Sequence, residues 1–260
     1  MAGLWSRAAA DYERSGAEFF GPLGRELVTR ARLRPGDHVL DVGTGRGHVL
    51  FPAAEAVGSD GMVTGIDIAG EMVRLTAAEI ELRGLRNATV RVGDAADPGL
   101  PADSVDAVLG GFMMFLLPDP AAALQAYARV LRSPGRLAFS TYGPLDPHLA
   151  AARSVLRKLA EMPESEPDVF DDEKAMTDLV GDAGFDDVTI AEIVVETRFA
   201  DIDQWWRWAW SVGIRASLER IDPARLDHYR PVIEEHLSAW RQPEDTFLMP
   251  TAVRFTTASI

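Results

Sequence analysis

Three glycines and one aspartate mark the part of the sequence best suited to chemistry. The stretch VLDVGTGRGHVLFPAA, residues 39–54, places Gly43, Gly45 and Gly47 between an apolar run and a predicted helix, with Asp41 just upstream. Glycines at a strand-to-helix turn let the backbone approach a ligand, and the helix amino terminus offers free N–H groups. Taken alone, one such loop is equally well explained as a tight turn without a ligand.

Two further aspartates follow at the spacing of successive strand–helix units. Asp67 ends the second predicted strand, 20 residues after Gly47, and Asp94 ends the third, 27 residues after Asp67. In an open parallel sheet, ligands bind beyond the carboxyl ends of the strands, where an acid can accept both ribose hydroxyl groups. Three acids at three successive strand ends therefore predict a ligand that contains an adenosine-like ribose.

A nicotinamide dinucleotide is the main alternative ligand. Its fingerprint is Gly-x-Gly-x-x-Gly, but here the third glycine, Gly47, comes one position early and His48 stands in its place. The carboxylate of Asp41 would repel a pyrophosphate, whereas it would attract an ammonium or sulfonium group. The loop therefore favours a positively charged ligand, and a nicotinamide-dependent oxidoreductase is kept as an alternative that dinucleotide binding would test.

The elements that must position these residues alternate along the first half of the chain. Five strand patterns separated by helical patterns predict a parallel, doubly wound sheet with right-handed crossovers. After residue 142, helices are expected over 143–165 and 201–245, and we interpret both segments as insertions around the sheet. Residues 1–32 form a predicted N-terminal helical cap, and 33–260 form the ligand-binding domain. The five expected strands span 38–43, 62–67, 88–94, 104–113 and 136–142.

Composition argues against several classes of function. The 260 residues carry 26 Lys+Arg against 40 Asp+Glu, a net charge of −14 without a basic patch, which argues against a nucleic-acid substrate. There is no cysteine, and no cluster of histidines or acids has metal-ligand spacing, so we expect no metal. No apolar run reaches the roughly 18 residues of a membrane span, and no signal peptide is evident, so a cytoplasmic location is expected.

The successive motifs VLDVGTGRGHV, GIDIAGEMV, VGDAADPGLPADSVDAVLG and ARVLRSPGRLAFS resemble those of class I S-adenosylmethionine-dependent methyltransferases. The resemblance is strong over 37–142, fair over 171–199 and 246–260, weak over 1–30 and absent over 201–245. It implies an α/β, Rossmann-like fold whose seven-stranded sheet is mostly parallel with an antiparallel last strand, plus helical lid insertions. The Asn/Asp-Pro-Pro-aromatic motif of amino-directed relatives is missing after the fourth strand, which counts against nucleic-acid and glutamine acceptors.

The resemblance also assigns roles to individual residues. It implies S-adenosylmethionine as cofactor, with Asp41 and the glycine loop at the methionine end, Asp67 on the ribose and Asp94 on the adenine amino group. Phe112 and the glycines before it would lie where the family lines the methyl-transfer site. The implied cofactor-binding residues are Asp41, Gly43, Thr44, Gly45, Gly47, Asp67, Ile68, Met72, Asp94, Ala95, Gly110, Gly111 and Phe112.

Candidates for proton transfer from the methyl acceptor come from outside these motifs. Methyl transfer to a hydroxyl or an activated carbon requires loss of a proton, and a positioned base accelerates such a step by roughly 10²–10⁴-fold. His148, which follows the fifth strand, and Tyr12, in the N-terminal segment, are the predicted catalytic residues. A helix-capping or surface histidine is an equally good interpretation of His148.

The run WWRWAW at 205–210 is the other unusual feature. Its tryptophans fall on two faces of a predicted helix, which must then be covered on both sides. The helix is either core throughout or a lid with one aromatic face over the acceptor. Arg207, Arg215 and Arg220 are candidates to hold an anionic acceptor group, or else are solvated.

The sequence therefore predicts a methyltransferase that acts on oxygen or carbon of a small, partly apolar metabolite, as in secondary metabolism. A monomer or a homodimer is expected. A pericyclase-like enzyme on the same fold, which binds the cofactor without methylating, and a non-catalytic binding protein are alternatives. Formation of S-adenosylhomocysteine on turnover distinguishes the methyltransferase from both.

Overall fold

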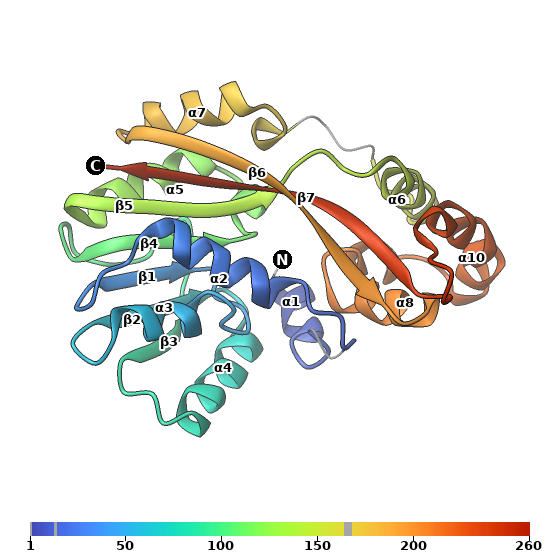
Figure 1. The fold of residues 1–260 in the computed structure, drawn as a ribbon, viewed down its shortest axis with the longest axis horizontal. Helices are drawn as coiled ribbons and strands as arrows, with labels where there is room; N and C mark the ends of the chain where they lie inside the picture. Colours follow the sequence, from blue (N-terminus) through green and yellow to red (C-terminus); the bar gives the residue numbers. More distant parts are fainter. Residues whose placement is uncertain (1, 13–14, 164–167) are drawn as a thin grey trace.

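The computed structural model describes residues 2–12, 15–163 and 168–260 and builds them around one seven-stranded sheet (Figure 1). The strand order is β3-β2-β1-β4-β5-β7-β6, and β7 runs antiparallel to the other six strands. This confirms the predicted Rossmann-like sheet with an antiparallel last strand. The strands are β1 (His38–Val42), β2 (Met62–Asp67), β3 (Ala88–Val92), β4 (Val105–Gly111), β5 (Leu131–Tyr142), β6 (Asp186–Phe199) and β7 (Phe247–Ser259).

Helices cover both faces of the sheet, which explains why its central strands are apolar on both sides. Successive side chains of β1 enter opposite cores: Val39 packs with α2 and α3, and Leu40 packs with α5 and α7. Asp41 is the one charged residue in this otherwise apolar part of β1, and it is fully buried. The covering helices are α2 (Phe20–Ala31), α3 (Leu50–Val57), α4 (Gly70–Leu82), α5 (Pro120–Val130) and α7 (Glu173–Asp182).

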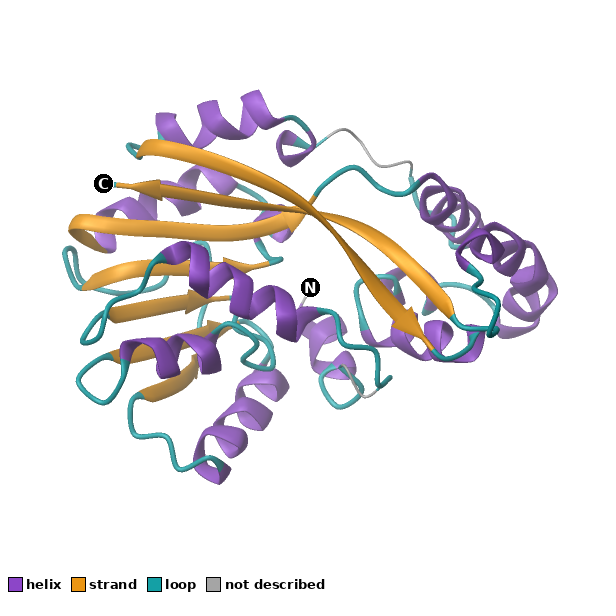
Figure 2. Cartoon of the chain, in the orientation of Figure 1, coloured by secondary structure: helices purple, strands orange, loops and turns teal. Residues whose placement is uncertain are grey.

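The two predicted insertions come together in space. Strands β6 and β7 continue past the end of β5, and four helices gather on this extension, at the right of Figures 1 and 2. Helix α6 packs against α10 and α9, while α8 packs against β6. These helices are α6 (Pro147–Leu159), α8 (Ile202–Ser211), α9 (Arg215–Leu218) and α10 (Pro223–Leu237).

Asp-Pro pairs begin several of these helices. Asp119, Asp146 and Asp222 each accept hydrogen bonds from backbone N–H groups of the first turn, and a proline follows each at the first helical position. The aspartate satisfies donors that have no partner within the helix, and proline needs none there. The helix starts around the carboxyl edge of the sheet are therefore fixed locally by the sequence.

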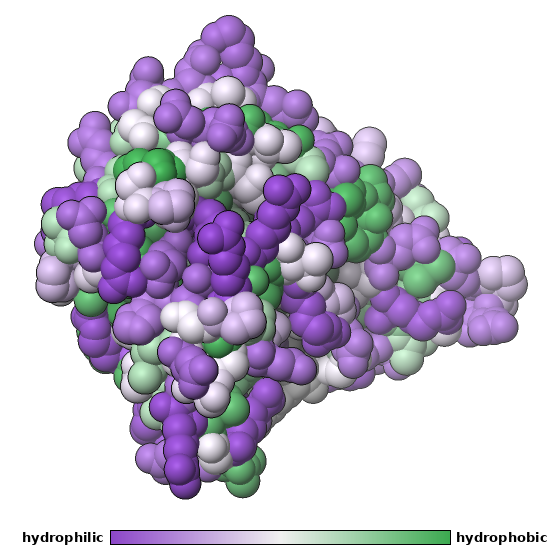
Figure 3. All heavy atoms as spheres, turned by 60° about the vertical axis from the view of Figure 1, so that its left-hand side comes forward, coloured by the Kyte–Doolittle hydropathy of each residue, from purple (hydrophilic) through white to green (hydrophobic). Residues whose placement is uncertain are grey.

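The N-terminal segment forms α1 (Ala2–Ala8) and α2, and α2 belongs to the main core. Gly24 of α2 lies so close to the first turn of α3 that a Cβ there would be 2.1 Å from the carbonyl oxygen of His48. Short 3₁₀ turns occur at Met114–Leu116, Val169–Asp171 and Ser238–Trp240. Within the described ranges, no helix is both long and apolar enough to cross a bilayer. The face drawn in Figure 3 is mostly hydrophilic, with apolar patches that are small and separate.

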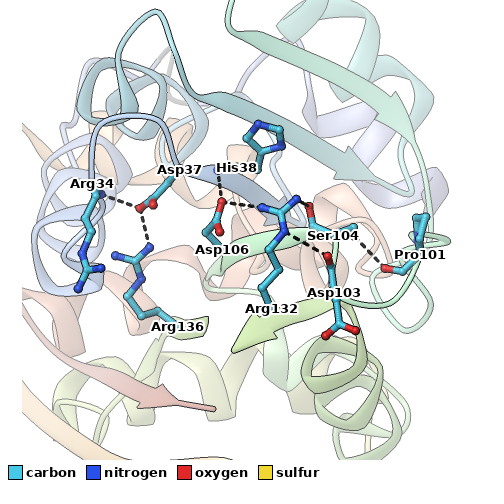
Figure 4. A network of polar contacts seen from close by, with 9 residues as sticks. All are labelled: Arg34, Asp37, His38, Pro101, Asp103, Ser104, Asp106, Arg132 and Arg136. Carbon is cyan, nitrogen blue, oxygen red and sulfur yellow. Dashed lines mark hydrogen bonds and ion pairs between the residues drawn. The ribbon is translucent and has the colours of Figure 1, made fainter. Parts of the chain in front are cut away.

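Charged side chains pair at the amino-terminal edge of the sheet (Figure 4). Asp106, in β4, accepts hydrogen bonds from the His38 backbone at 2.7 Å and from Nη1 of Arg132 at 2.9 Å. Asp37, just before β1, accepts one from Nη2 of Arg136 at 2.6 Å. These contacts join β1, β4 and β5 at the edge away from the glycine loop.

Candidate active site

A cavity of about 340 Å³, which we call the strand-end cavity, lies at the carboxyl ends of β1, β2, β3 and β4. A smaller cavity of about 40 Å³ adjoins it below the glycine loop and is lined by Asp41 and Thr44. Of the predicted cofactor-binding residues, only Gly47 and Gly110 line neither. The predicted residues that line one or both are Asp41, Gly43, Thr44, Gly45, Asp67, Ile68, Met72, Asp94, Ala95, Gly111 and Phe112.

The three loop glycines have positive φ angles of 65°, 50° and 81° at Gly43, Gly45 and Gly47, a conformation that disfavours other residues. Their surroundings differ. A Cβ on Gly43 would lie 2.8 Å from Cβ of Met113, and one on Gly47 would lie 2.5 Å from the ring of Phe51. A Cβ on Gly45 would meet no atom closer than 3.9 Å, although Gly45 lines both cavities. Gly45 is therefore the position where a side chain would enter ligand space rather than protein.

Asp41 is a buried carboxylate with one oxygen in use. Its Oδ2 accepts a hydrogen bond from Oγ1 of Thr44 at 2.6 Å, whereas its Oδ1 forms no hydrogen bond with the residues that the structure describes. Burial raises the pKa of Asp41 to about 7; the Thr44 hydroxyl and the backbone N–H of Leu50 oppose this rise, and the nearby charge of Asp67 adds to it. A buried acceptor atom without a donor beside a cavity fits a ligand that brings a cationic N–H group.

Asp67 ties the glycine loop to the end of β2. One carboxylate oxygen accepts from the backbone N–H of Gly45 and the other from that of Ala69, both at 2.8 Å. Burial raises the pKa of Asp67. Each oxygen keeps lone-pair capacity, and the residue lines the strand-end cavity, so the carboxylate can also accept ribose hydroxyls.

Asp94 and its neighbours form the next wall of the strand-end cavity. Asp94 Oδ1 accepts from the backbone N–H of Ala96 at 2.9 Å, and the hydroxyl of Tyr127 donates to the carbonyl of Ala95 at 2.7 Å. Ile68, which also lines this cavity, is 48% exposed and offers an apolar surface where a flat base can pack. This arrangement fits an adenine whose amino group faces an acidic side chain.

Phe112 lies where the cavities meet. It lines the strand-end cavity, the small cavity and a third of about 560 Å³, which we call the aromatic cavity. Its φ is 53°, unusual for phenylalanine, and its backbone N–H donates to the carbonyl oxygen of Ser140 at 3.1 Å. Such strained residues cluster at functional sites, because the surrounding structure holds them in place.

The aromatic cavity extends from Phe112 toward the helices on the β6–β7 extension. The rings of Phe112 and Tyr142 are 4.9 Å apart, and Phe115 lies 5.4 Å from Tyr142. Phe19 packs edge-on to Trp208 at 6.0 Å. All five rings line the cavity, which therefore suits a flat, apolar molecule.

Several polar groups interrupt this aromatic wall. Oγ1 of Thr141, Oγ1 of Thr251 and Nε1 of Trp208 are buried there without a hydrogen-bond partner. Burial raises the pKa of Tyr142 to about 12, so its phenol stays protonated at neutral pH. Arg153 of α6 also lines the cavity. Such a wall can orient a ligand that carries oxygen atoms.

The predicted catalytic residues are separated by the structure. Tyr12 lines all three cavities, and its ring stacks on Phe20 at 5.1 Å. His148 lies exposed in the first turn of α6, with its backbone N–H bonded to Asp146, and it lines none of them. The geometry supports a role for Tyr12 and gives no support to His148 as a base.

The Trp-rich helix α8 contributes some side chains to the hydrophobic core and others to the wall of the aromatic cavity. Trp205 and Trp206 are buried against each other at 5.1 Å, and Nε1 of Trp206 donates to Glu234 of α10 at 2.8 Å. Trp208, one turn on, lines the aromatic cavity together with Val212. Only one face of the helix therefore borders a ligand site.

The three arginines predicted near this helix do not line the aromatic cavity. Arg207 is exposed and lies 3.9 Å from Asp201, and Arg215 pairs with Glu219 at 2.7 Å. Nε of Arg220 donates to the carbonyl oxygen of Ala160 at 3.2 Å. Arg207 thus faces solvent, whereas Arg215 and Arg220 are bonded to protein groups, and none of the three lines the cavity in which an acceptor would bind.

Sequence reasoning missed Arg153, Thr141, Tyr142 and Thr251. One signal was available for Arg153, because it falls among Leu149, Ala152 and Leu156 on the buried side of an amphipathic helix. An arginine there needs a partner or a ligand. In the part of the chain that the structure describes, no group of three or more His, Cys, Asp or Glu residues has the arrangement of a metal site.

Known proteins resemble both the sequence and the fold. A family profile described as a methyltransferase domain matches residues 33–190. The chain is 39% identical over 240 residues to a nocamycin O-methyltransferase of Saccharothrix syringae, with 85% of each protein covered. It is 47% identical over 137 residues to an aklanonic acid methyltransferase of Streptomyces sp. (strain C5), covering 53% of this chain and 62% of that protein. The YcgJ protein of Bacillus subtilis shares the fold, with a TM-score of 0.63 at 18% identity over 92% of this chain and 98% of that one.

Proposed function

The chain belongs to the S-adenosylmethionine-dependent methyltransferases, and we propose that it methylates an oxygen atom of a small, oxygenated and partly apolar metabolite. Methylation of a small molecule at oxygen or carbon follows from the family and its relatives. The choice of oxygen is supported by the relative named as an O-methyltransferase. The observation that carries the proposal is that the aromatic cavity adjoins the strand-end cavity at Phe112 and Tyr12.

The residues present fit S-adenosylmethionine. Asp41, with its unpartnered Oδ1, would hold the methionine ammonium group, and Gly45 leaves the space that the methionine portion needs. Asp67 would accept the ribose hydroxyls, and Asp94 the adenine amino group. When bound, the cofactor supplies a methyl group on a sulfonium, which an in-line nucleophile displaces to leave S-adenosylhomocysteine.

The protein contributes alignment and exclusion of water. Rings from α2, β5 and α8 enclose the aromatic cavity, and fixing two reactants in line can contribute roughly 7–11 kcal/mol to lowering a barrier. Tyr12 is our candidate to relay the acceptor proton, with its Oη accepting that proton while its own passes to solvent, because it lines both the strand-end and the aromatic cavity. Tyr142, protonated at neutral pH, would donate a hydrogen bond to the acceptor instead.

Turnover with aklanonic acid and related oxygenated polycyclic compounds tests this function. We expect acceptor-dependent formation of S-adenosylhomocysteine and a mass increase of one methyl group on oxygen. Conversion of an acceptor without S-adenosylhomocysteine would indicate the pericyclase-like alternative, and cofactor binding without turnover would indicate a binding protein. Binding of a nicotinamide dinucleotide in place of S-adenosylmethionine would indicate an oxidoreductase.

We further propose a free small molecule as the partner, a cytoplasmic location, and a monomer or homodimer as the working form. The net charge of −14 supports a substrate other than nucleic acid. Activity should survive exhaustive chelation, because the described residues offer no ready ligand cluster. Loss of activity that Mg²⁺ restores would assign a role to acids such as Asp94 or Asp97.

A further inference from the structure

Arg153 brings to the wall of the aromatic cavity a positive charge that none of the described residues pairs with. Its guanidinium makes no hydrogen bond or ion pair with any residue that the structure describes. Burial lowers the pKa of Arg153; the groups that interact with it electrostatically are the phenol of Tyr142 and a second cation, Arg157. A partly buried guanidinium that no described acid neutralises loses solvation without compensation, so its place in the cavity wall favours an anionic ligand.

A second arginine near the same end of the sheet, Arg254, is paired with acids and carbonyl groups and serves as a comparison for Arg153. Arg254 of β7 is buried, and its Nε lies 2.9 Å from Glu192 and 3.7 Å from Glu173. Its Nη1 also donates to the carbonyl oxygens of Phe170 and Asp171. The fold therefore neutralises one buried arginine with several acceptors, while Arg153 faces the cavity without any.

The two acidic residues that line the aromatic cavity, Asp168 and Asp171, accept backbone hydrogen bonds and do not pair with Arg153. A carboxylate oxygen of Asp168 accepts from the backbone N–H of Phe170, and one of Asp171 accepts from that of Asp168, so the two close a capping box. Neither is among the groups that interact electrostatically with Arg153. The charge of Arg153 is thus available to something that enters the cavity.

We infer that Arg153 binds an anionic oxygen group of the methyl acceptor, so that the acceptor is a flat aromatic acid bearing a carboxylate or an acidic enol. The aromatic walls would hold its rings, and the unpartnered Thr141, Thr251 and Trp208 groups would bond its other oxygen atoms. A guanidinium presents paired N–H donors that match a carboxylate. The identity of the occupant as acceptor rests on the proposed function; the anion site does not.

Arg153 lines only the aromatic cavity, whereas Phe112 and Tyr12 also line the strand-end cavity. The guanidinium therefore lies on the side of the acceptor away from the cofactor. There it would fix the orientation of the acceptor, and a neutral analogue of the same shape would bind weakly. Arg153 is thus a specificity-determining residue for acidic acceptors.

The affinities of two matched fluorescent probes test this inference without any need for enzyme turnover. Anthracene-9-carboxylate and the neutral anthracene-9-carboxamide have the same rings and nearly the same shape. With the protein saturated by S-adenosylhomocysteine, we expect the carboxylate to bind at least tenfold more tightly than the carboxamide. Arg153→Gln should weaken carboxylate binding roughly 10- to 100-fold and leave carboxamide binding within about twofold. Arg153→Lys should keep part of the preference, and the exposed control Arg207→Gln should keep all of it.

Equal binding of the two probes by the wild type, or no binding of either, overturns the inference and needs no variant to show it. A preference that persists in a folded Arg153→Gln protein also overturns it. Affinity for S-adenosylhomocysteine, measured by calorimetry on each variant, reports folding and should not change. If the protein prefers the carboxylate probe but methylates no acceptor, the proposed function is rejected and the anion site stands. If it methylates an acceptor but shows no carboxylate preference, the anion site is rejected and the proposed function stands.

Discussion

Asp106 and Asp41 lie in the neighbouring strands β4 and β1 but near opposite edges of the sheet. At the amino edge burial acts against ionisation of Asp106, yet hydrogen bonds from the His38 backbone and Arg132 hold its pKa below the ordinary value. At the carboxyl edge burial dominates, and the pKa of Asp41 rises to about 7. The same residue type is thus stabilised as an anion at one edge and destabilised at the other.

This difference separates groups that hold the fold together from groups kept for a ligand. In the network of Figure 4, Asp37 pairs with Arg136 and Asp106 pairs with Arg132, and among the residues drawn only Nε of Arg136 is buried without a partner. The carboxyl edge and the cavity beyond it leave Asp41 Oδ1, two threonine hydroxyls and a tryptophan N–H without partners. Such groups cost stability in the unliganded protein. Nε1 of Trp205 and Nε of Arg157 are also without partners among the described residues and line none of the three cavities, but these four groups lie together around the cavities, as expected of a ligand site.

Replacing Asp41 by asparagine should give the largest change, and in the unexpected direction. The folded pKa of about 7 lies above the unfolded value near 4, so this group's contribution to stability is full below pH 4 and lost as pH rises toward 7. Asp41→Asn should therefore stabilise the unliganded protein at pH 8, by up to about 4 kcal/mol. Urea unfolding at pH 5 and pH 8 measures this, and a variant less stable than wild type at pH 8 would refute it. Affinity for S-adenosylmethionine should fall at least tenfold.

Gly45→Val should abolish measurable binding of S-adenosylmethionine, a loss of more than about 100-fold, because the side chain enters the cavity. Gly84→Val is the matched control: its φ of 64° imposes similar strain, and no atom lies within 4 Å of its Cβ. Both variants should lose similar stability, while only Gly45→Val loses the cofactor in calorimetry. Normal binding by a folded Gly45→Val protein would make the loop a simple turn.

Asp106→Asn should act on stability alone. The variant loses charge-assisted hydrogen bonds to Arg132 and the His38 backbone, so unfolding at pH 8 should become easier by about 1.5–3 kcal/mol. The lowered pKa of Asp106 means that its contribution is present above pH 4 and lost as pH falls further. Cofactor affinity should stay within about twofold of wild type, and a larger drop would show that the two edges are coupled.

Asp67→Ala should weaken S-adenosylmethionine binding at least tenfold, since charge-assisted hydrogen bonds to ribose are worth about 1.5–3 kcal/mol each. The variant also frees the Gly45 N–H, so part of the loss comes through the loop. Calorimetry with S-adenosylmethionine and with methionine separates the two causes, because only the first ligand carries ribose. Unchanged affinity in a folded variant would remove Asp67 from the site.

The residues that line the proposed cofactor site could be grouped from the sequence because their signals are local. Asp41, Asp67 and Asp94 lie within two residues of a strand's carboxyl end, and parallel strands bring these ends to one edge whatever the details of packing. The prediction of seven strands with an antiparallel last strand came from the family resemblance, since nothing local in 246–260 specifies a direction, and the strand order itself was not predicted.

The acceptor side was largely beyond prediction because it is assembled from distant segments. Arg153 of α6, Trp208 of α8 and Thr251 of β7 meet only because β6 and β7 extend past β5 and carry helices from two insertions. His148 was chosen for its place after the fifth strand, but the helix that begins there turns its first residues to solvent. The position of a residue in the sequence shows near which edge of the sheet it lies. It does not show whether the helix that carries it turns that residue toward the cavity or toward solvent.

Two buried threonines allow a comparison of small stability effects, because the hydroxyl of one forms a hydrogen bond and the hydroxyl of the other does not. Thr76 Oγ1 donates to the carbonyl oxygen of Gly45 at 2.7 Å, whereas Thr251 Oγ1 has no partner in the aromatic cavity. Valine has nearly the same shape, so Thr76→Val should lower stability by about 1 kcal/mol, while Thr251→Val should leave it unchanged or raise it by less than that. Parallel urea titrations of the unliganded proteins measure the difference, and S-adenosylhomocysteine affinity should be unaffected in Thr251→Val. Equal destabilisation by the two changes would mean that the Thr251 hydroxyl is already satisfied, and it would then no longer count as a group kept for the acceptor.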